Sequence, residues 1–277
     1  MSMPENKPEQ NYIDINRESW NNRTEIHVKS AFYDLDGFLK GNSSLNDIEL
    51  SLLGDIKGKS VLHLQCHFGQ DTISLSRLGA KVTGVDLSDI AIEKAKQIAK
   101  DTESNATFIC CDIYDLPNHL NEKFDIVFTS YGTIGWIPDL DKWAKIASDF
   151  LRPNGQFVFV EFHPVVWMFD DDFEALAYRY FNSGAIVETE VGTYADKNAD
   201  LKQSYVMWNH SISEVINNLI KHGLEIKSFD EFDYSPYNCF NKTIEFAPKK
   251  FRIKHLADKI PMVYAINAAR KSTANNK

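Results

Sequence analysis

The carboxylate of Asp86 stands where a nucleotide-type cofactor could bind to it. Asp86 follows the apolar run at 81–85, which itself comes after a turn at 65–70 and a helical stretch at 71–78. In doubly wound folds ligands bind at the carboxyl ends of the strands, and a carboxylate there can accept hydrogen bonds from both ribose hydroxyls. The N–H groups of the turn before the helix face the same ligand. The alternative role is a helix cap, although Ser88 already fits that role.

Two classes of cofactor are bound by this order of strand, turn, helix, strand and acid: dinucleotides and S-adenosylmethionine. The dinucleotide fingerprint needs Gly-x-Gly-x-x-Gly, so that the pyrophosphate can approach the backbone. The turn here reads QCHFGQ at 65–70, with one glycine and bulky residues where the phosphates would need room. The turn therefore counts against a nicotinamide dinucleotide.

The turn lies within an alternation of short apolar runs and amphipathic stretches, which predicts βαβ units and a parallel sheet with helices on both faces. The expected fold is α/β, with a doubly wound, seven-stranded and mostly parallel sheet whose last two strands form an antiparallel edge. Strands are predicted at 60–65, 81–85, 107–111, 124–129, 156–162, 224–232 and 262–269, and helices at 71–78, 89–99, 140–151 and 213–222.

Two segments outside this alternation are expected to cover the site. Residues 12–54 carry apolar residues at helical spacing and are predicted to form a helical lid of two or three helices. Residues 164–209 are rich in aromatics and contain two strand-like stretches, which indicate an inserted hairpin after the fifth strand that caps the substrate. A single domain over 12–270 follows, with its cofactor-binding core at 55–163 and the rest of the sheet at 210–270. The tails at 1–11 and 271–277 are expected to be disordered.

The order of these segments resembles class I S-adenosylmethionine-dependent methyltransferases. Their first motif has the form acidic-x-Gly-x-Gly-x-Gly, and this chain has His63, Gln65, His67 and Gly69 at those positions, so only the last glycine is kept. Asp86 matches the ribose-binding acid of the family. The first-motif sequence HLQCHFGQD is similar to that of a bacterial subgroup of small-molecule methyltransferases. The resemblance covers roughly 55–164 and 211–270.

The resemblance implies S-adenosyl-L-methionine as methyl donor and S-adenosyl-L-homocysteine as product. It also implies that Asp112 binds the adenine amino group while the N–H of Ile113 faces the ring. Several members of the expected set have structural alternatives. Asp112 is then an ordinary loop acid, Gln65 and His67 are polar residues that satisfy the turn, Cys66 is a small buried hydrophobe, and Trp20 packs on the sheet edge. The expected cofactor-binding residues are Gln65, Cys66, His67, Gly69, Asp86, Leu87, Ser88, Asp112, Ile113, Thr129, Ser130, Tyr33 and Trp20.

The transferred methyl group is expected above the ends of the first and fourth strands. The loop at 130–136 follows the fourth strand, and its two glycines let it approach a ligand closely. Tyr131 in this loop is a candidate catalytic residue that can favour a sulfonium through cation–π attraction. His163, after the fifth strand, has the chemistry of a general base, and His210 is the second candidate. For both histidines the alternative is a structural hydrogen bond.

Aromatic residues are predicted to select the acceptor. Trp136 of the loop at 130–136 and Tyr205 and Trp208 of the insertion are the candidate substrate residues, because an aromatic wall suits an organic molecule. A dimer interface made from the same residues is the alternative. Both a monomer and a homodimer stay open.

The amino-acid composition limits which classes of binding partner are expected. The 277 residues carry 39 acidic and 30 basic side chains, a net charge of −9, which disfavours a nucleic-acid partner. The four cysteines show no CxxC spacing, so neither a disulfide framework nor a metal site is expected. No leader or membrane span is recognised, which predicts a cytoplasmic protein.

The resulting hypothesis is an enzyme that transfers a methyl group to a small molecule. The first alternative is a binding module that holds S-adenosylmethionine or S-adenosylhomocysteine without transfer, which the missing glycines motivate. The second, less favoured, is an NAD-dependent oxidoreductase.

Overall fold

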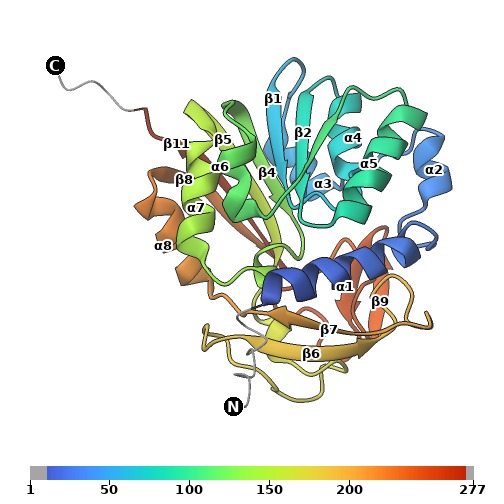
Figure 1. Cartoon of the computed structure of the whole chain (residues 1–277). Coiled ribbons are helices and arrows are strands. Elements are labelled where there is room, and N and C mark those ends of the chain that lie inside the picture. Colours follow the sequence, from blue (N-terminus) through green and yellow to red (C-terminus); the bar gives the residue numbers. More distant parts are fainter. Residues whose placement is uncertain (1–10, 273–277) are drawn as a thin grey trace, which may run out of the picture.

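A seven-stranded sheet forms the centre of the computed structural model, which describes residues 11–272 (Figure 1). The strand order is β3-β2-β1-β4-β5-β11-β8, with β1 to β5 parallel and β11 antiparallel to both of its neighbours. The predicted doubly wound, mostly parallel sheet is therefore confirmed. The strands are β1 (Ser60–Leu64), β2 (Lys81–Asp86), β3 (Thr107–Cys110), β4 (Phe124–Ser130), β5 (Leu151–Phe162), β8 (Leu224–Phe232) and β11 (Val263–Arg270).

Helices cover both faces of the sheet because successive residues of each strand point to opposite sides. Val61 and Ile126 belong to the apolar cluster that packs under α3 and α4, whereas Leu62 and Val127 belong to the cluster under α7 and α8. Helix α5 packs beside α4 on the first face. The helices are α3 (Asp47–Leu53), α4 (Gln70–Arg77), α5 (Asp89–Asp101), α6 (Leu116–His119), α7 (Leu140–Asp149) and α8 (Ile212–Lys221).

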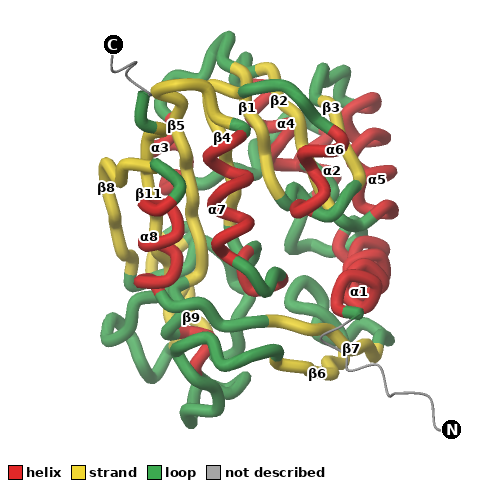
Figure 2. The backbone as a smooth tube through the Cα atoms, turned by 60° about the vertical axis from the view of Figure 1, so that its left-hand side comes forward, coloured by secondary structure: helices red, strands yellow, loops and turns green. Residues whose placement is uncertain are grey.

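The N-terminal segment forms α1 (Tyr12–His27), α2 (Leu35–Leu39) and α3, as predicted for two or three helices. Helix α1 packs on α5 and on β7, and Figure 1 shows it running across the carboxyl edge of the sheet, whereas Figure 2 shows it end-on below α5. The inserted hairpin is also present, because β6 (Ile186–Val191) and β7 (Lys202–Met207) pair antiparallel. Helix α1 thus lies between the sheet and this hairpin.

A second hairpin between β8 and β11 was not predicted. It consists of β9 (Thr243–Ala247) and β10 (Lys250–Ile253), which pair antiparallel. The hairpin carries a short basic run at 249–254, and two of its side chains are engaged locally. Arg252 pairs with Asp233, and the Lys250 ammonium lies 4.7 Å from the centre of the Tyr234 ring.

Most element boundaries lie within two residues of the prediction, and the largest difference is the start of β5. Helix α7 ends at Asp149, and β5 begins at Leu151 where a strand was predicted only from residue 156, with irregular pairing to β4 over these residues. Asn154 takes a left-handed conformation there, with φ of 62°. The predicted tails at 1–11 and 271–277 lie outside the described residues, apart from residues 11, 271 and 272.

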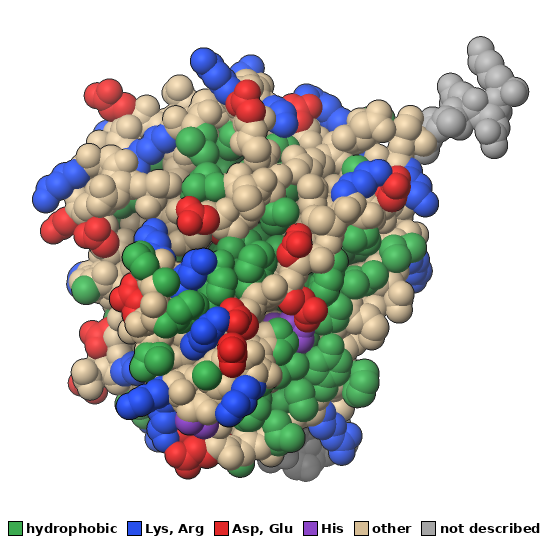
Figure 3. Space-filling model, turned by 180° about the vertical axis from the view of Figure 1, so that it is seen from behind, with side chains coloured by type: hydrophobic (Ala, Val, Ile, Leu, Met, Phe, Trp, Pro, Cys, Tyr) green, Lys and Arg blue, Asp and Glu red, His purple; other side chains and the backbone are tan. Residues whose placement is uncertain are grey.

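Charged side chains of both signs are interspersed on the face of the molecule shown in Figure 3, around a centre of hydrophobic side chains. A continuous basic surface is absent from that face. This distribution agrees with the acidic balance of the sequence, which disfavours binding to a phosphate backbone.

Gly69 is expected to be the glycine of the first turn that cannot be replaced. Its φ is 80°, and a Cβ there would lie 2.6 Å from the Phe108 ring and 2.9 Å from the Cβ of Ala95. Gly223 has the same φ and no atom within 4 Å of such a Cβ. We expect Gly223→Ala to lower the free energy of unfolding by about 1–2 kcal/mol, the cost of a left-handed residue. Gly69→Ala should cost roughly 1–3 kcal/mol more, because of overpacking. Urea denaturation measures the free energy of unfolding of both variants. Equal losses would show that the contact with Phe108 adds no further cost at Gly69.

Candidate active site

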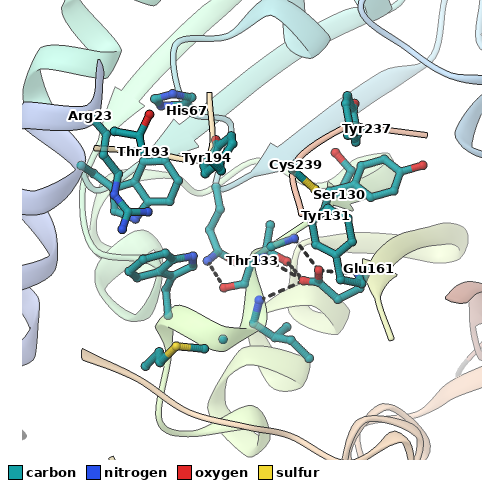
Figure 4. Close-up of a pocket in the computed structure, with 18 of the residues that line it drawn as sticks. Arg23, His67, Ser130, Tyr131, Thr133, Glu161, Thr193, Tyr194, Tyr237 and Cys239 are labelled. Carbon is teal, nitrogen blue, oxygen red and sulfur yellow. Dashed lines mark hydrogen bonds between the residues drawn. The ribbon is translucent and has the colours of Figure 1, made fainter. Parts of the chain in front are cut away.

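A cavity of about 1540 Å³ lies at the carboxyl ends of β1, β2, β4 and β5. Its walls come from the loops that follow these strands, from α1, and from both hairpin regions. Figure 4 shows part of this lining, with Arg23 and His67 on one side and Tyr131 and Tyr237 on the other. The volume exceeds the roughly 300–1,000 Å³ of a typical small-molecule pocket, so two ligands can share it.

The turn after β1 keeps the backbone conformation of a glycine motif, although only the last of the motif's glycines is present. Gln65, His67 and Gly69 have φ values of 57°, 50° and 80°. A left-handed conformation costs a non-glycine residue roughly 1–2 kcal/mol. Contacts hold the two strained residues: the Gln65 amide donates to the carbonyl oxygen of Thr133 at 2.7 Å, and the His67 N–H donates to Asp86 at 2.7 Å.

The two acids predicted to bind the cofactor lie at the ends of neighbouring strands and line the cavity. Asp86 accepts from the N–H groups of His67 and Ser88, at 2.7 and 2.9 Å, and burial raises the pKa of its carboxyl to about 6. Asp112 accepts from the N–H of Tyr114 at 3.0 Å, and burial likewise raises the pKa of Asp112. Each carboxylate therefore keeps lone pairs that these bonds do not use.

Most of the predicted cofactor residues line the cavity, but two do not. Ser88 is buried, caps α5 by accepting from the N–H of Ala91, and donates to Asn21 of α1 at 2.6 Å. Thr129 is fully buried within β4. Ser88 thus serves the fold by tying α1 to the sheet. The predicted residues in the lining are Trp20, Tyr33, Gln65, Cys66, His67, Gly69, Asp86, Leu87, Asp112, Ile113 and Ser130.

Arg23 of the helical lid lines the cavity, although it was not among the expected cofactor-binding residues. Its guanidinium pairs with Glu190 of β6 at 2.6 Å. The guanidinium also lies about 5 Å from the centres of three aromatic rings, those of Trp20, Trp136 and Tyr205. Cation–π attraction and the ion pair together compensate the burial of the charge. Arg23 follows Trp20 by three residues in the sequence, a spacing that places both side chains on one face of α1.

A histidine pair joins α1 to the first turn. The Nδ1 of His27 lies 2.9 Å from the Nε2 of His67. Burial lowers the pKa of His27 to about 2 and that of His67 to about 3, with the nearby Arg23 charge adding to both shifts. Both rings are therefore neutral at physiological pH, and one donates a hydrogen bond to the other.

Glu161 fixes the loop that follows β4. This buried carboxylate of β5 accepts hydrogen bonds from the N–H groups of Gly132, Thr133 and Ile134, as Figure 4 shows for the Thr133 segment. Burial raises the pKa of Glu161, and these backbone bonds oppose the rise. The carboxylate thus positions the loop that carries Tyr131.

The placement of His163 argues against its predicted role as general base. It lies outside the cavity lining. Its Nδ1 accepts from the N–H of Val165, and its Nε2 therefore carries the proton that is shared with Glu231 at 2.9 Å. No lone pair of the ring is left to take a proton from an acceptor.

The other two catalytic candidates line the cavity. In His210, Nε2 donates to the carbonyl oxygen of Ile137 at 2.9 Å, and Nδ1 lies 3.1 Å from a carboxylate oxygen of Glu214. The protein thus engages Nε2, whereas Nδ1 is buried and forms no hydrogen bond with the described residues. Tyr131 has φ of 47° and donates its hydroxyl hydrogen to Glu49 at 2.8 Å, and its ring stands in the wall of the cavity.

All three predicted substrate residues line the cavity. Trp136 and Tyr205 contact each other and Arg23, with their ring centroids 5.4 Å apart. Trp208 is more deeply buried and packs edge-on against Tyr12 of α1, at 5.1 Å. These residues therefore form an aromatic wall at the junction of α1, the loop after β4 and β7.

Two absences hold for the described part of the chain. No three metal-ligating side chains converge there, and the acidic run at 170–172 is no exception. None of the helices within residues 11–272 combines the length and the apolar character that crossing a membrane would require.

The sequence profile of a methyltransferase domain matches residues 55–224. The chain therefore belongs to the methyltransferase domain family, and the family predicted from its motifs is confirmed. A curated relative, the ubiquinone biosynthesis O-methyltransferase of Coxiella burnetii, is 31% identical over 126 residues, which cover 44% of this chain and 53% of the relative. The chain thus matches only about half the length of such relatives.

Solved structures show the same fold. A putative S-adenosylmethionine-dependent methyltransferase from Listeria monocytogenes has a TM-score of 0.55 and 22% identity, covering 80% of this chain and 95% of that one. An S-adenosylmethionine-dependent methyltransferase from Mesorhizobium loti has a TM-score of 0.56 and 20% identity, covering 84% and 100%. At these identities the likeness establishes the architecture alone.

Cofactor affinity is expected to depend on pH through Asp86. Its carboxyl has a pKa of about 6, so the ionised form that best accepts from ribose hydroxyls is lost as pH falls through 6. We expect the affinity for S-adenosylhomocysteine to be constant from pH 7 to 8 and about tenfold lower at pH 5. Titration calorimetry at each pH measures it.

Asp86→Asn tests the same carboxylate. It should weaken binding at pH 8 by about 1–3 kcal/mol and flatten the pH dependence, because the amide cannot ionise. Asp101→Asn, an exposed change at the far end of α5, is the control and should bind normally. An unaltered pH dependence in Asp86→Asn would exclude the ribose role.

Proposed function

We propose that this protein is an S-adenosylmethionine-dependent methyltransferase that acts on a small organic molecule. The observation that carries the proposal is the placement of Asp86 and Asp112 beside one cavity, at the ends of paired strands, in a chain of the methyltransferase domain family. The proposal explains both carboxylates together, as partners of a ribose and of an adenine amino group.

The residues present fit the cofactor. Asp86 and Asp112 hold unused lone pairs at the cavity wall, and Gln65, His67 and Gly69 keep the left-handed turn that lets a ligand lie against the backbone. The cofactor supplies a methyl group activated by a sulfonium. The chain then needs to hold the acceptor in line and exclude water, which the cover of α1 and the hairpins does.

The acceptor is proposed to be a small molecule with a hydroxyl group. The aromatic wall of Trp136, Tyr205 and Trp208 suits an organic ring, and the net charge of −9 disfavours nucleic acid. The curated relatives are named as O-methyltransferases of ubiquinone biosynthesis, which supports oxygen as the methylated atom.

We further propose that the protein works in the cytoplasm and belongs to the subgroup with HLQCHFGQD in its first motif. All four cysteines are free, which suits a reducing compartment. Gln65 and His67 support the assignment to this subgroup. Each side chain forms a specific hydrogen bond, at a position where the general methyltransferase motif has glycine.

The test of the cofactor is calorimetry with S-adenosylmethionine, S-adenosylhomocysteine and NAD in parallel. We expect micromolar binding of the two adenosyl compounds and no heat from NAD. Tight NAD binding alone would replace the proposal by an oxidoreductase.

The test of transfer follows methyl-labelled S-adenosylmethionine with a panel of catechols and other phenols. We expect labelled product and equimolar S-adenosylhomocysteine. Tight adenosyl binding without transfer to any acceptor would instead indicate a binding module.

A further inference from the structure

A buried carboxylate stands directly behind Tyr131. Glu49 of α3 has no exposed surface, and its Oε2 accepts the hydroxyl hydrogen of Tyr131 at 2.8 Å. Tyr131 lines the cavity, whereas Glu49 does not. The tyrosine therefore links the cavity to this carboxylate through a hydroxyl group, and Figure 4 shows Tyr131 beside Tyr237 at that wall.

Glu49 is held by hydrogen bonds and not by a cation. Its Oε1 accepts from the N–H of Asn46 at 2.6 Å and from the Asn46 amide at 3.1 Å. Within residues 11–272 no lysine, arginine or histidine forms an ion pair with Glu49. Burying an ionised carboxylate without a cation is costly. A purely structural role could be filled by a neutral glutamine, so the acid points to a function.

The surrounding network opens on the cavity. Asn46 also donates to the Tyr237 hydroxyl at 2.8 Å, and Asp71 contacts Ser130, the residue before Tyr131, at 3.4 Å. Asn46, Asp71, Ser130 and Tyr237 all line the cavity. Asn46 and Tyr131 both line this wall and both donate to Glu49. Of the two, Tyr131 carries the hydroxyl, which can accept a proton from a bound hydroxyl group and pass its own to Glu49.

We propose that Tyr131 and Glu49 form a proton relay that removes the hydroxyl proton of the acceptor during methyl transfer. The inference rests on the proposed function and narrows it to acceptors that lose a proton. As the acceptor oxygen bonds to the methyl carbon, the carbon–sulfur bond breaks and its electron pair returns to sulfur. The acceptor proton passes to the Tyr131 oxygen while the tyrosine proton passes to Glu49. The products are the methyl ether, S-adenosylhomocysteine and protonated Glu49, which later loses its proton to solvent.

The ionisation of both groups suits these roles. Burial, and next the Asp71 charge, raise the pKa of Glu49 to about 7, while the hydrogen bonds from Asn46 and Tyr131 oppose the rise. Burial, followed by the Glu49 charge, raises the pKa of Tyr131 well above its usual value, so its hydroxyl keeps a proton to donate. The other ionisable groups nearby are Tyr237, Tyr234 and, beside Asp71, Lys249. Glu49 is thus a base above pH 7 and loses this ability below it.

The first test needs no acceptor. Protein labelled with ¹³C at glutamate carboxyls is titrated by NMR with S-adenosylhomocysteine bound, and Glu49→Gln identifies the signal. We expect one carboxyl to titrate near pH 7 and to shift its midpoint upward in Tyr131→Phe, because the hydroxyl bond to the ionised form is lost. A carboxyl already ionised at pH 5, or still protonated at pH 9, would overturn the relay.

The second test compares acceptors with and without a proton to lose. Catechol loses a proton on methylation, whereas iodide gives methyl iodide without one. Glu49→Gln should lower transfer to catechol by about 10²–10⁴-fold at pH 8, the range of general acid–base catalysis, and abolish the rise of rate through pH 7. Transfer to iodide should be unchanged. Tyr131→Phe should lose the same pH dependence, and the double variant should be no slower than the slower single variant.

Asp47→Asn, an exposed change on the same helix, is the control and should behave as wild type. S-adenosylhomocysteine affinity is measured for every protein. If the wild-type protein does not bind S-adenosylhomocysteine, the proposed function is overturned. Normal binding with equal catechol rates in wild type and Glu49→Gln, or an equal loss with iodide, would overturn the relay alone.

Discussion

The hydrogen bonds between the Asp86 carboxylate and the N–H groups of His67 and Ser88 fix the site, because they join the turn after β1 to the end of β2. A turn built from left-handed residues is unfavourable where those residues are not glycine. The carboxylate holds the turn in place at this cost. The same bonds keep Asp86 at the cavity wall with lone pairs to spare, so one group both shapes the site and is available to a ligand.

Buried hydrogen bonds also join the strand ends further along the carboxyl edge of the sheet. The Gln65 amide reaches from the turn after β1 to the carbonyl oxygen of Thr133, and the N–H of Thr133 donates to Glu161 of β5. Four neighbouring strands are thus connected at their ends by buried polar bonds, from Asp86 on β2 to Glu161 on β5. Such a network is favourable only when each member finds its partner. The side chain of Gln65 therefore supplies a connection between strands that a glycine there could not make.

The sequence predicted what depends on local pattern and missed what depends on distant partners. Strands, helices and the acids after β2 and β3 followed from hydrophobic periodicity and order. His163 had the right residue type for a base, but its partner Glu231 lies 68 residues away, and that partner decides its role. Glu49 escaped notice because Tyr131 lies 82 residues further along the chain. The hairpin of β9 and β10 was missed because its strands have only five and four residues, although both alternate polar and apolar side chains.

Helix α1 and the first hairpin form one cover over the cavity. Asn16 exchanges two hydrogen bonds with the backbone of Val206 on β7, at 2.8 and 2.9 Å, and Arg23 pairs with Glu190 on β6. The same helix contacts the turn after β1 through His27 and α5 through Asn21. Moving α1 and the hairpin together away from the sheet would leave the Arg23 pair intact but separate His27 from His67 and Asn21 from Ser88 and Asp89. Moving the hairpin alone would leave the buried Arg23 charge without its partner, which is strongly destabilising. The cover is therefore expected to move as a unit, so that the state of the first turn and access to the aromatic wall change together.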